Sequence, residues 1–158
     1  MELKKNVSLI LIGIILIVSS YFIYRQLKEF YTEDDSKLDE LKKILQQLFP
    51  KNEKYSGVLE PLNNRNILSE ISLRKGEKSF TINKTKIFLC LKDKKDEYYN
   101  NNMLIYVLLH EIAHCLCDEI GHTEKFHNIF NALLERATKM NIFDPKKSID
   151  KNYCDYKN

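Results

Sequence analysis

The sequence predicts a small α+β domain that follows one apolar N-terminal helix. A run without charges near the N-terminus predicts this helix, and the β-rich and helical segments after it predict the domain. The 158-residue chain leaves room for one domain of ordinary size. We assign residues 1–25 to the N-terminal helix, 26–35 to a polar linker, 36–143 to the domain and 144–158 to a C-terminal tail. Within the domain we expect a three- to four-stranded sheet packed on helices.

The N-terminal run reads VSLILIGIILIVSSYFIY over residues 7–24, with Lys5 before it and Arg25 after it. At 1.5 Å per residue a helix of this length spans a hydrocarbon core of ~30 Å. The run exceeds the ~7–15 apolar residues of a signal peptide and lacks a small-x-small cleavage site. It predicts a single-pass membrane anchor. The four cysteines form no CxxC pair, which favours the reducing, cytoplasmic side for the rest of the chain.

An amphipathic helix is predicted directly after the linker. Ser36 and Asp39 form a capping box, and Pro50 ends the pattern. The apolar stripe between them consists of Leu38, Leu41, Leu45 and Leu48. From Pro50 to Asn66, the Gly, Pro and Asn content predicts irregular structure.

Short β-rich stretches then predict the sheet. We expect strands near residues 67–73, 79–82 and 86–91, separated by turn signals at Lys75-Gly76 and Asn83-Lys84. The sheet should be antiparallel in part. No internal repeat is evident in the sequence.

Two helices follow the sheet. Asn100, Asn101 and Asn102 offer N-caps for the segment MLIYVLLHEIAHCLC, which is apolar on nearly every side and therefore belongs in the domain centre. Gly121 is expected to stop this helix. The second helix carries one apolar stripe, made of Phe126, Phe130, Leu133, Ala137 and Met140.

The segment HEIAH carries the chemistry. His110 and His114 lie one helical turn apart, so both imidazoles can face one metal ion, with Glu111 beside them. A zinc ion with three protein ligands activates a water molecule and polarises a carbonyl, and Glu111 would act as the catalytic base. The alternative is two core histidines bonded to the backbone. An apolar helix would bury such polar groups at a high cost unless they bound a metal or each other.

His122 is the predicted third zinc ligand. Gly121 before it can adopt positive φ and reverse the chain, and Phe126 after it would anchor the turn in the core. All the histidines of the chain lie between residues 110 and 127, which indicates a shared role. Other residues remain possible ligands or supports of the ligands: Asp118, Glu119, Glu124, Cys117 and His127. In an oxidising compartment, a disulfide between Cys117 and Cys154 would tie the tail to this helix.

The segment HEIAHCLCDEIGHTEKF resembles the WLM and SprT-like branch of minimal zincin metallopeptidases, in which HExxH is followed by a histidine and an aromatic residue four places later. His110, Glu111, His114, His122 and Phe126 match this pattern. The resemblance covers residues 36–143 loosely and 86–134 well. Its layout is similar to membrane-anchored, zincin-like proteins of large DNA viruses. It implies an α+β zincin fold, one Zn²⁺ per chain and peptide hydrolysis.

The leading hypothesis is a membrane-anchored zinc endopeptidase whose extended protein or peptide substrate adds along residues 86–91. Tyr98, Tyr99 and Tyr153 are candidates for stabilising the oxyanion. The alternatives are a zinc-binding but inactive interaction protein of the membrane and a protease of DNA-bound proteins. The net charge is only +3 and the lysines are interspersed with acids, so a nucleic-acid partner is not expected. The sequence carries no signal for an oligomeric state.

Overall fold

The computed structural model describes residues 2–30 and 35–154, with side chains described for residues 10–25 and 35–154. The chain divides into two compact units, Met1–Glu33 and Asp34–Asn158. Most of the predicted linker, residues 26–34, falls where side chains are not described, and residues 31–34 lie outside the described residues altogether. The last part of the tail, residues 155–158, also lies outside the described residues.

The first unit is one helix, α1 (Glu2–Phe30), which extends beyond both ends of the apolar run at residues 7–24. The structure contradicts the membrane anchor predicted for residues 7–24 and, with it, the single-pass localisation. In the described part of the chain, no helix is long and apolar enough to cross a membrane.

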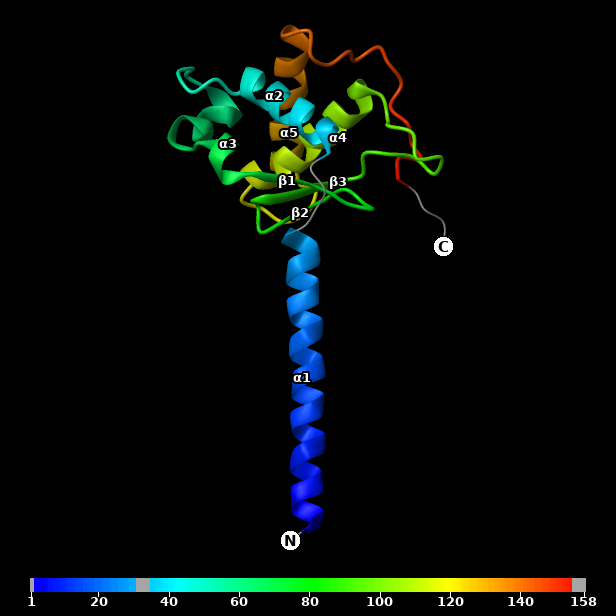
Figure 1. Cartoon of the computed structure of the whole chain (residues 1–158). Helices are drawn as coiled ribbons and strands as arrows, with labels where there is room; N and C mark the ends of the chain where they lie inside the picture. The colour runs from blue at the N-terminus through cyan, green and yellow to red at the C-terminus, as the bar shows by residue number, and fades with distance from the viewer. Residues whose placement is uncertain (1, 31–34, 155–158) are drawn as a thin grey trace. The chain divides into compact units, whose positions relative to one another are not determined.

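The second unit contains a small sheet and several helices (Figure 1). Its helices are α2 (Ser36–Leu48), the 3-10 helix η1 (Gly57–Asn64), α3 (Ile67–Glu70), α4 (Asn101–Leu116) and α5 (Glu124–Lys139). Its strands are β1 (Ser72–Lys75), β2 (Phe80–Ile82) and β3 (Lys86–Leu89). The predicted α+β class therefore holds for this unit, with a sheet of three strands.

The strand order is β1-β3-β2, so β3 lies in the middle and β2 forms an edge. β1 pairs with β3 in parallel, with Leu73 opposite Ile87. β2 pairs with β3 in antiparallel orientation, with Thr81 opposite Ile87. The turn between them has positive φ at Asn83 and Lys84 (50° and 56°), as tight hairpins require. The mixed pairing agrees with the prediction of a partly antiparallel sheet.

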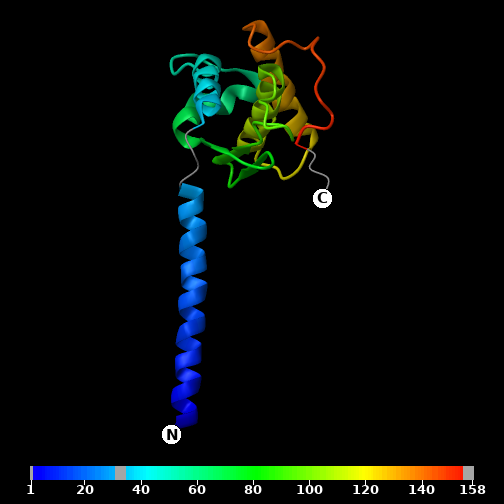
Figure 2. The same ribbon diagram turned by 45° about the vertical axis from the view of Figure 1, so that its right-hand side comes forward.

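Helix α4 occupies the centre of the unit. It packs against β2 and β3 on one side and against α5 on the other, while α2 packs against β1 and η1 against α5 (Figures 1 and 2). Leu104, Leu108 and Ile112 of α4 are fully buried. The apolar character of this segment on nearly all sides follows from this position between a sheet and a helix.

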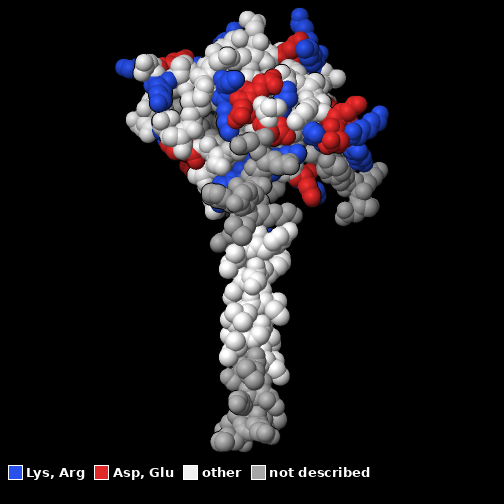
Figure 3. All heavy atoms as spheres, in the orientation of Figure 1, with Lys and Arg blue, Asp and Glu red and all other residues white. Residues whose placement is uncertain are grey.

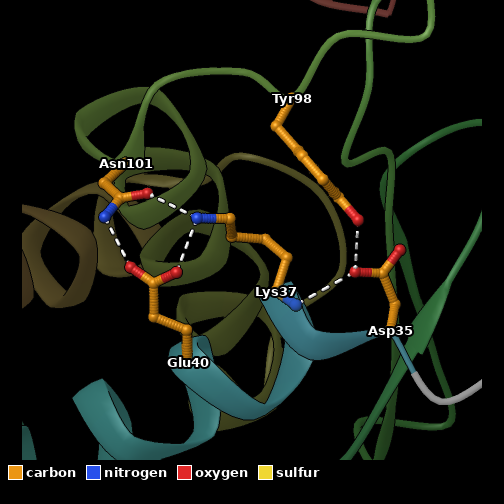
Figure 4. Close-up of polar contacts among 5 residues, drawn as sticks. All are labelled: Asp35, Lys37, Glu40, Tyr98 and Asn101. Carbon is orange, nitrogen blue, oxygen red and sulfur yellow. Dashed lines mark hydrogen bonds and ion pairs between the residues drawn. The ribbon is translucent and has the colours of Figure 1, made fainter.

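The N-cap of helix α2 lies one residue before the predicted N-cap. Asp35, not Ser36, is the N-cap, and its Oδ1 accepts hydrogen bonds from the Lys37 backbone N–H at 3.0 Å and from the Tyr98 hydroxyl at 3.0 Å (Figure 4). Asn101 and Lys37 both bond to the Glu40 carboxylate in the same view. These contacts fasten α2 to the segment that leads into α4.

The predicted strand at residues 67–73 is wrong in its first part. Residues Ile67–Glu70 form helix α3, and the strand begins only at Ser72. A side-chain interaction favours this turn, because the Glu70 carboxylate accepts hydrogen bonds from the backbone N–H of Asn66 and from the Arg65 guanidinium. Within Pro50–Asn66, where irregular structure was expected, η1 forms.

The predicted disulfide between Cys117 and Cys154 is also wrong. Cys154 pairs with Cys90, at the end of β3, over a sequence separation of 64 residues. Cys115 and Cys117 are free and buried. Cys117 is the C-cap residue of α4 and is fully buried.

Charged groups of both signs lie close together on the face of the second unit in view (Figure 3). The ion pairs of this unit include Arg136 with Glu53 and Arg65 with Glu70. Such a mixed surface is typical of a solvated domain.

Candidate metal centre

Two of the three clustered imidazoles come from α4. The Asn100 side chain caps this helix by accepting from the Met103 N–H at 3.0 Å. His110 and His114 lie one turn apart near its C-terminal end, and their ring centroids are 4.9 Å apart. Both side chains are half-buried.

The third imidazole comes from the connection between α4 and α5. α4 ends at Leu116, before Gly121, so the glycine does not stop the helix as predicted. Gly121 instead has φ of +87° within the connection, a conformation that L side chains rarely adopt. Thr123 then caps α5 by accepting from the Phe126 N–H. His122, between these two residues, turns back over α4.

His110, His114 and His122 each offer a ring nitrogen, and these atoms lie within 4.8 Å of one another. The Nε2 atoms of His110 and His122 are 3.0 Å apart. Among the described residues, no other His, Cys, Asp or Glu joins a group of three such donors. Three imidazole donors around one point are a ligand set that suits zinc and leaves a fourth position open.

The Phe126 ring packs against all three imidazole rings. Its centroid lies 5.0 Å from that of His110, 4.4 Å from that of His114 and 4.8 Å from that of His122. The Phe126 side chain is fully buried. Phe126 therefore lies in the core, where the sequence predicted it, and contacts each of the three histidines.

The environment favours neutral imidazoles. Burial, with the charges of the neighbouring histidines, lowers the pKa of His110 to about 4. Burial also lowers the pKa of His114, and His122 and Lys84 act in the same direction. Neutral imidazole is the form that binds metal.

Glu111 lies beside the cluster and is only 5% exposed. Its Oε2 accepts a hydrogen bond of 2.8 Å from the hydroxyl of Thr81 on β2. Burial raises the pKa of the Glu111 carboxyl, and the hydrogen bond from Thr81 lowers it by less. The carboxyl thus sits between α4 and the edge strand.

These side chains border an open cleft of about 480 Å³. Phe80 and Thr81 of β2 line one side, and Ile120 and His122 of the α4–α5 connection line the other. Ile120 is 94% exposed and Phe80 is 42% exposed. The cleft therefore combines polar groups at its base with apolar side chains at its rim.

The other predicted site residues are not brought into the cluster. His127 is exposed on α5, with its ring centroid 6.3 Å from that of His122, and Cys117 is buried as the C-cap of α4. Asp118 pairs with Lys125, while Glu119 borders the cleft and Glu124 begins α5, none of them among the converging donors.

The three tyrosines proposed for the oxyanion form contacts elsewhere. The Tyr153 hydroxyl contacts Ser79 Oγ at 2.8 Å and the Cys90 carbonyl at 2.5 Å. Tyr98 donates to Asp35, and Tyr99 accepts from the Cys154 N–H. None of these tyrosines lines the cleft.

Sequence reasoning missed Thr81, Phe80 and Ile120. Alternation along strand 79–82 would have placed Phe80 and Ile82 in the core and Thr81 outside. The structure has the reverse arrangement, because Phe80 and Ile82 are exposed and Thr81 contacts Glu111. Ile120 carried a weaker signal, as an apolar side chain in an otherwise polar connection.

The chain is 55% identical over 121 residues to "Uncharacterized protein 136R" of Invertebrate iridescent virus 6, which covers 72% of this chain and 68% of that protein. It belongs to the 136R family. Another member of the 136R family, "Uncharacterized protein 042R" of Invertebrate iridescent virus 3, is 42% identical over 118 residues, 73% of this chain and 74% of that protein. A protein of Acanthamoeba polyphaga mimivirus is 34% identical over 69% of this chain and 58% of its own length. No family model and no solved structure matches the chain.

Proposed function

We propose that this member of the 136R family is a zinc-dependent peptidase of the zincin type. The observation that carries the proposal is the convergence of His110, His114 and His122 next to Glu111, at the base of an open cleft. His110, His114 and His122 would hold the zinc ion. When bound, zinc would lower the pKa of a coordinated water and polarise the carbonyl of a peptide bond.

Glu111 fits the part of general base. Its carboxylate would take a proton from the attacking water and deliver it to the departing amine. Burial raises its pKa, which brings the group closer to the range in which a carboxyl can both accept and return a proton. Its place beside the cleft gives it access to a substrate.

The strand order favours another substrate path than the one expected from the sequence. The strand at 86–91 cannot accept an added peptide strand, because β3 is paired on both sides. β2 is an edge strand and borders the cleft through Phe80 and Thr81. An extended peptide would add along β2, with its side chains near the apolar rim formed by Phe80 and Ile120.

A Glu111→Gln variant tests the proposed function. The amide keeps the size of the side chain but cannot accept the proton, so we expect kcat to fall about 100-fold or more while zinc content stays unchanged. The measurement is digestion of a broad peptide library by the zinc-loaded 158-residue chain, with metal analysis of each preparation.

The matched control is Glu135→Gln, the same change at an exposed ion pair with Lys139 on α5. It should keep full activity. Turnover by Glu111→Gln equal to that of an active wild type would overturn Glu111 as the general base. No turnover by the zinc-loaded wild type would overturn the peptidase and favour a zinc-binding protein without catalysis.

A further inference from the structure

The Glu111 carboxylate is held from one direction only. Thr81 Oγ1 contacts Oε2 at 2.8 Å and the Glu111 backbone carbonyl at 3.2 Å. Among the described residues, Oε1 has no hydrogen-bond partner. A carboxylate fixed through one oxygen presents the other in a defined direction, and Glu111 lines the same cleft as the three histidines.

The strand that carries Thr81 is itself anchored at both ends. After β2, Lys84 Nζ donates to the Cys117 carbonyl at the C-terminus of α4, at 2.5 Å. Before β2, Ser79 Oγ contacts the Tyr153 hydroxyl at 2.8 Å and accepts from the Cys90 N–H at 3.0 Å. An edge strand is paired on one side only, so these three contacts at the two ends of β2 help to fix the position of Thr81 against α4.

The strand geometry also selects Thr81 for this contact. Phe80 and Ile82 point to the opposite face of the sheet, where Phe80 stacks on Phe88 with centroids 4.8 Å apart. Thr81 is therefore the β2 residue whose side chain faces α4. Its β-branched side chain has few rotamers, which limits the directions its hydroxyl can take.

We propose that Thr81 is a positioning residue, which orients the Glu111 carboxylate so that Oε1 faces the attacking water in the cleft. This inference rests on the proposed peptidase function. Thr81 does not need to touch the substrate for this role. It acts through the carboxylate, as outer partners commonly do around metal sites.

The test compares Thr81→Val with Thr81→Ser in the zinc-loaded 158-residue chain. Valine keeps the shape but removes the hydroxyl, and serine keeps the hydroxyl. We expect Thr81→Val to lower kcat about 10- to 100-fold with KM changed less than about twofold and zinc content unchanged. Thr81→Ser should recover most of the lost kcat. Thr138→Val, which removes a hydroxyl bonded to the Leu134 carbonyl on α5, is the matched control and should behave as wild type.

Crystal structures of the same variants give a readout that does not depend on turnover. The Glu111 side chain should keep one position in Thr81→Ser and should shift or split in Thr81→Val. An unchanged Glu111 position and an unchanged kcat in Thr81→Val would overturn the positioning role. Loss of kcat in Thr81→Ser equal to that in Thr81→Val would overturn it too. A failed peptidase would be recognised separately, because the zinc-loaded wild type would then turn over no substrate.

Discussion

Tyr153 connects the C-terminal segment to the sheet through its hydroxyl, which contacts Ser79 and the Cys90 carbonyl. Burial raises its pKa to about 12, with a smaller opposing effect from the hydrogen bond with Ser79. The sequence suggested this residue as a candidate for stabilising the oxyanion. In the structure its hydroxyl instead forms hydrogen bonds between the C-terminal segment and the sheet. Spacing along the chain could not reveal this, because the contact joins residues far apart in sequence.

The raised pKa of this half-buried phenol predicts a loss of stability in alkali. The unfolded chain releases the tyrosine proton near pH 10, whereas the folded chain keeps it up to about pH 12. The stabilising contribution is therefore complete below pH 10 and is lost as the pH rises from 10 to 12. It amounts to about 2 to 3 kcal/mol at 1.36 kcal/mol per pKa unit.

Urea unfolding at several pH values between 8 and 12 checks this expectation. Tyr153→Phe should be less stable than wild type at pH 8 and should show a much flatter decline above pH 10. An identical alkaline decline in the two proteins would show that Tyr153 does not cause it.

At the scale of elements, the sequence predicted both helices of the candidate site and two of the three strands near their observed positions. The pattern HEIAH placed His110 and His114 on one face because helical spacing alone determines that relation. The strand at 67–73 failed because the contact of Glu70 with Arg65 favours a helical turn that local β propensity does not report. The position of β2 at a sheet edge, on which the proposed substrate path rests, depends on strand order, and no local sequence pattern predicts it.

The N-cap of α2 gives a second prediction at this scale. Asp35→Ala removes the cap and the acceptor of the Tyr98 hydroxyl, and Asp35 is only 8% exposed (Figure 4). We expect the free energy of unfolding to fall by about 2 to 3 kcal/mol. Asp39→Ala on the same helix removes only an exposed ion pair with Lys42 and should cost less than about 0.5 kcal/mol. Chemical denaturation measures the free energy of unfolding of both variants. An equal loss in the two variants would show that the Asp35 contacts stabilise the fold no more than the exposed ion pair does.

At the scale of the second unit, the Cys90–Cys154 disulfide joins the C-terminal segment to the end of β3. The sequence offered four cysteines and no spacing rule to pair them, so the pairing had to come from the fold. Closing a loop of 64 residues restricts the unfolded chain and contributes about 4 kcal/mol in the chain-entropy model.

Reduction of this disulfide should therefore destabilise the domain. A reductant should lower the melting temperature of wild type by about 10 °C or more. Cys154→Ser should melt near the temperature of the reduced wild type, and the reductant should not lower it further. A melting temperature that the reductant leaves unchanged in wild type would contradict the pairing.

The account as a whole depends on one zinc ion held by three imidazoles. Diffraction data collected on either side of the zinc absorption edge from crystals of the zinc-loaded chain test this most directly. The account predicts one anomalous peak per chain, about 2.0 to 2.1 Å from a ring nitrogen of each of His110, His114 and His122. A peak bound by other residues, or no peak between these rings, would contradict it.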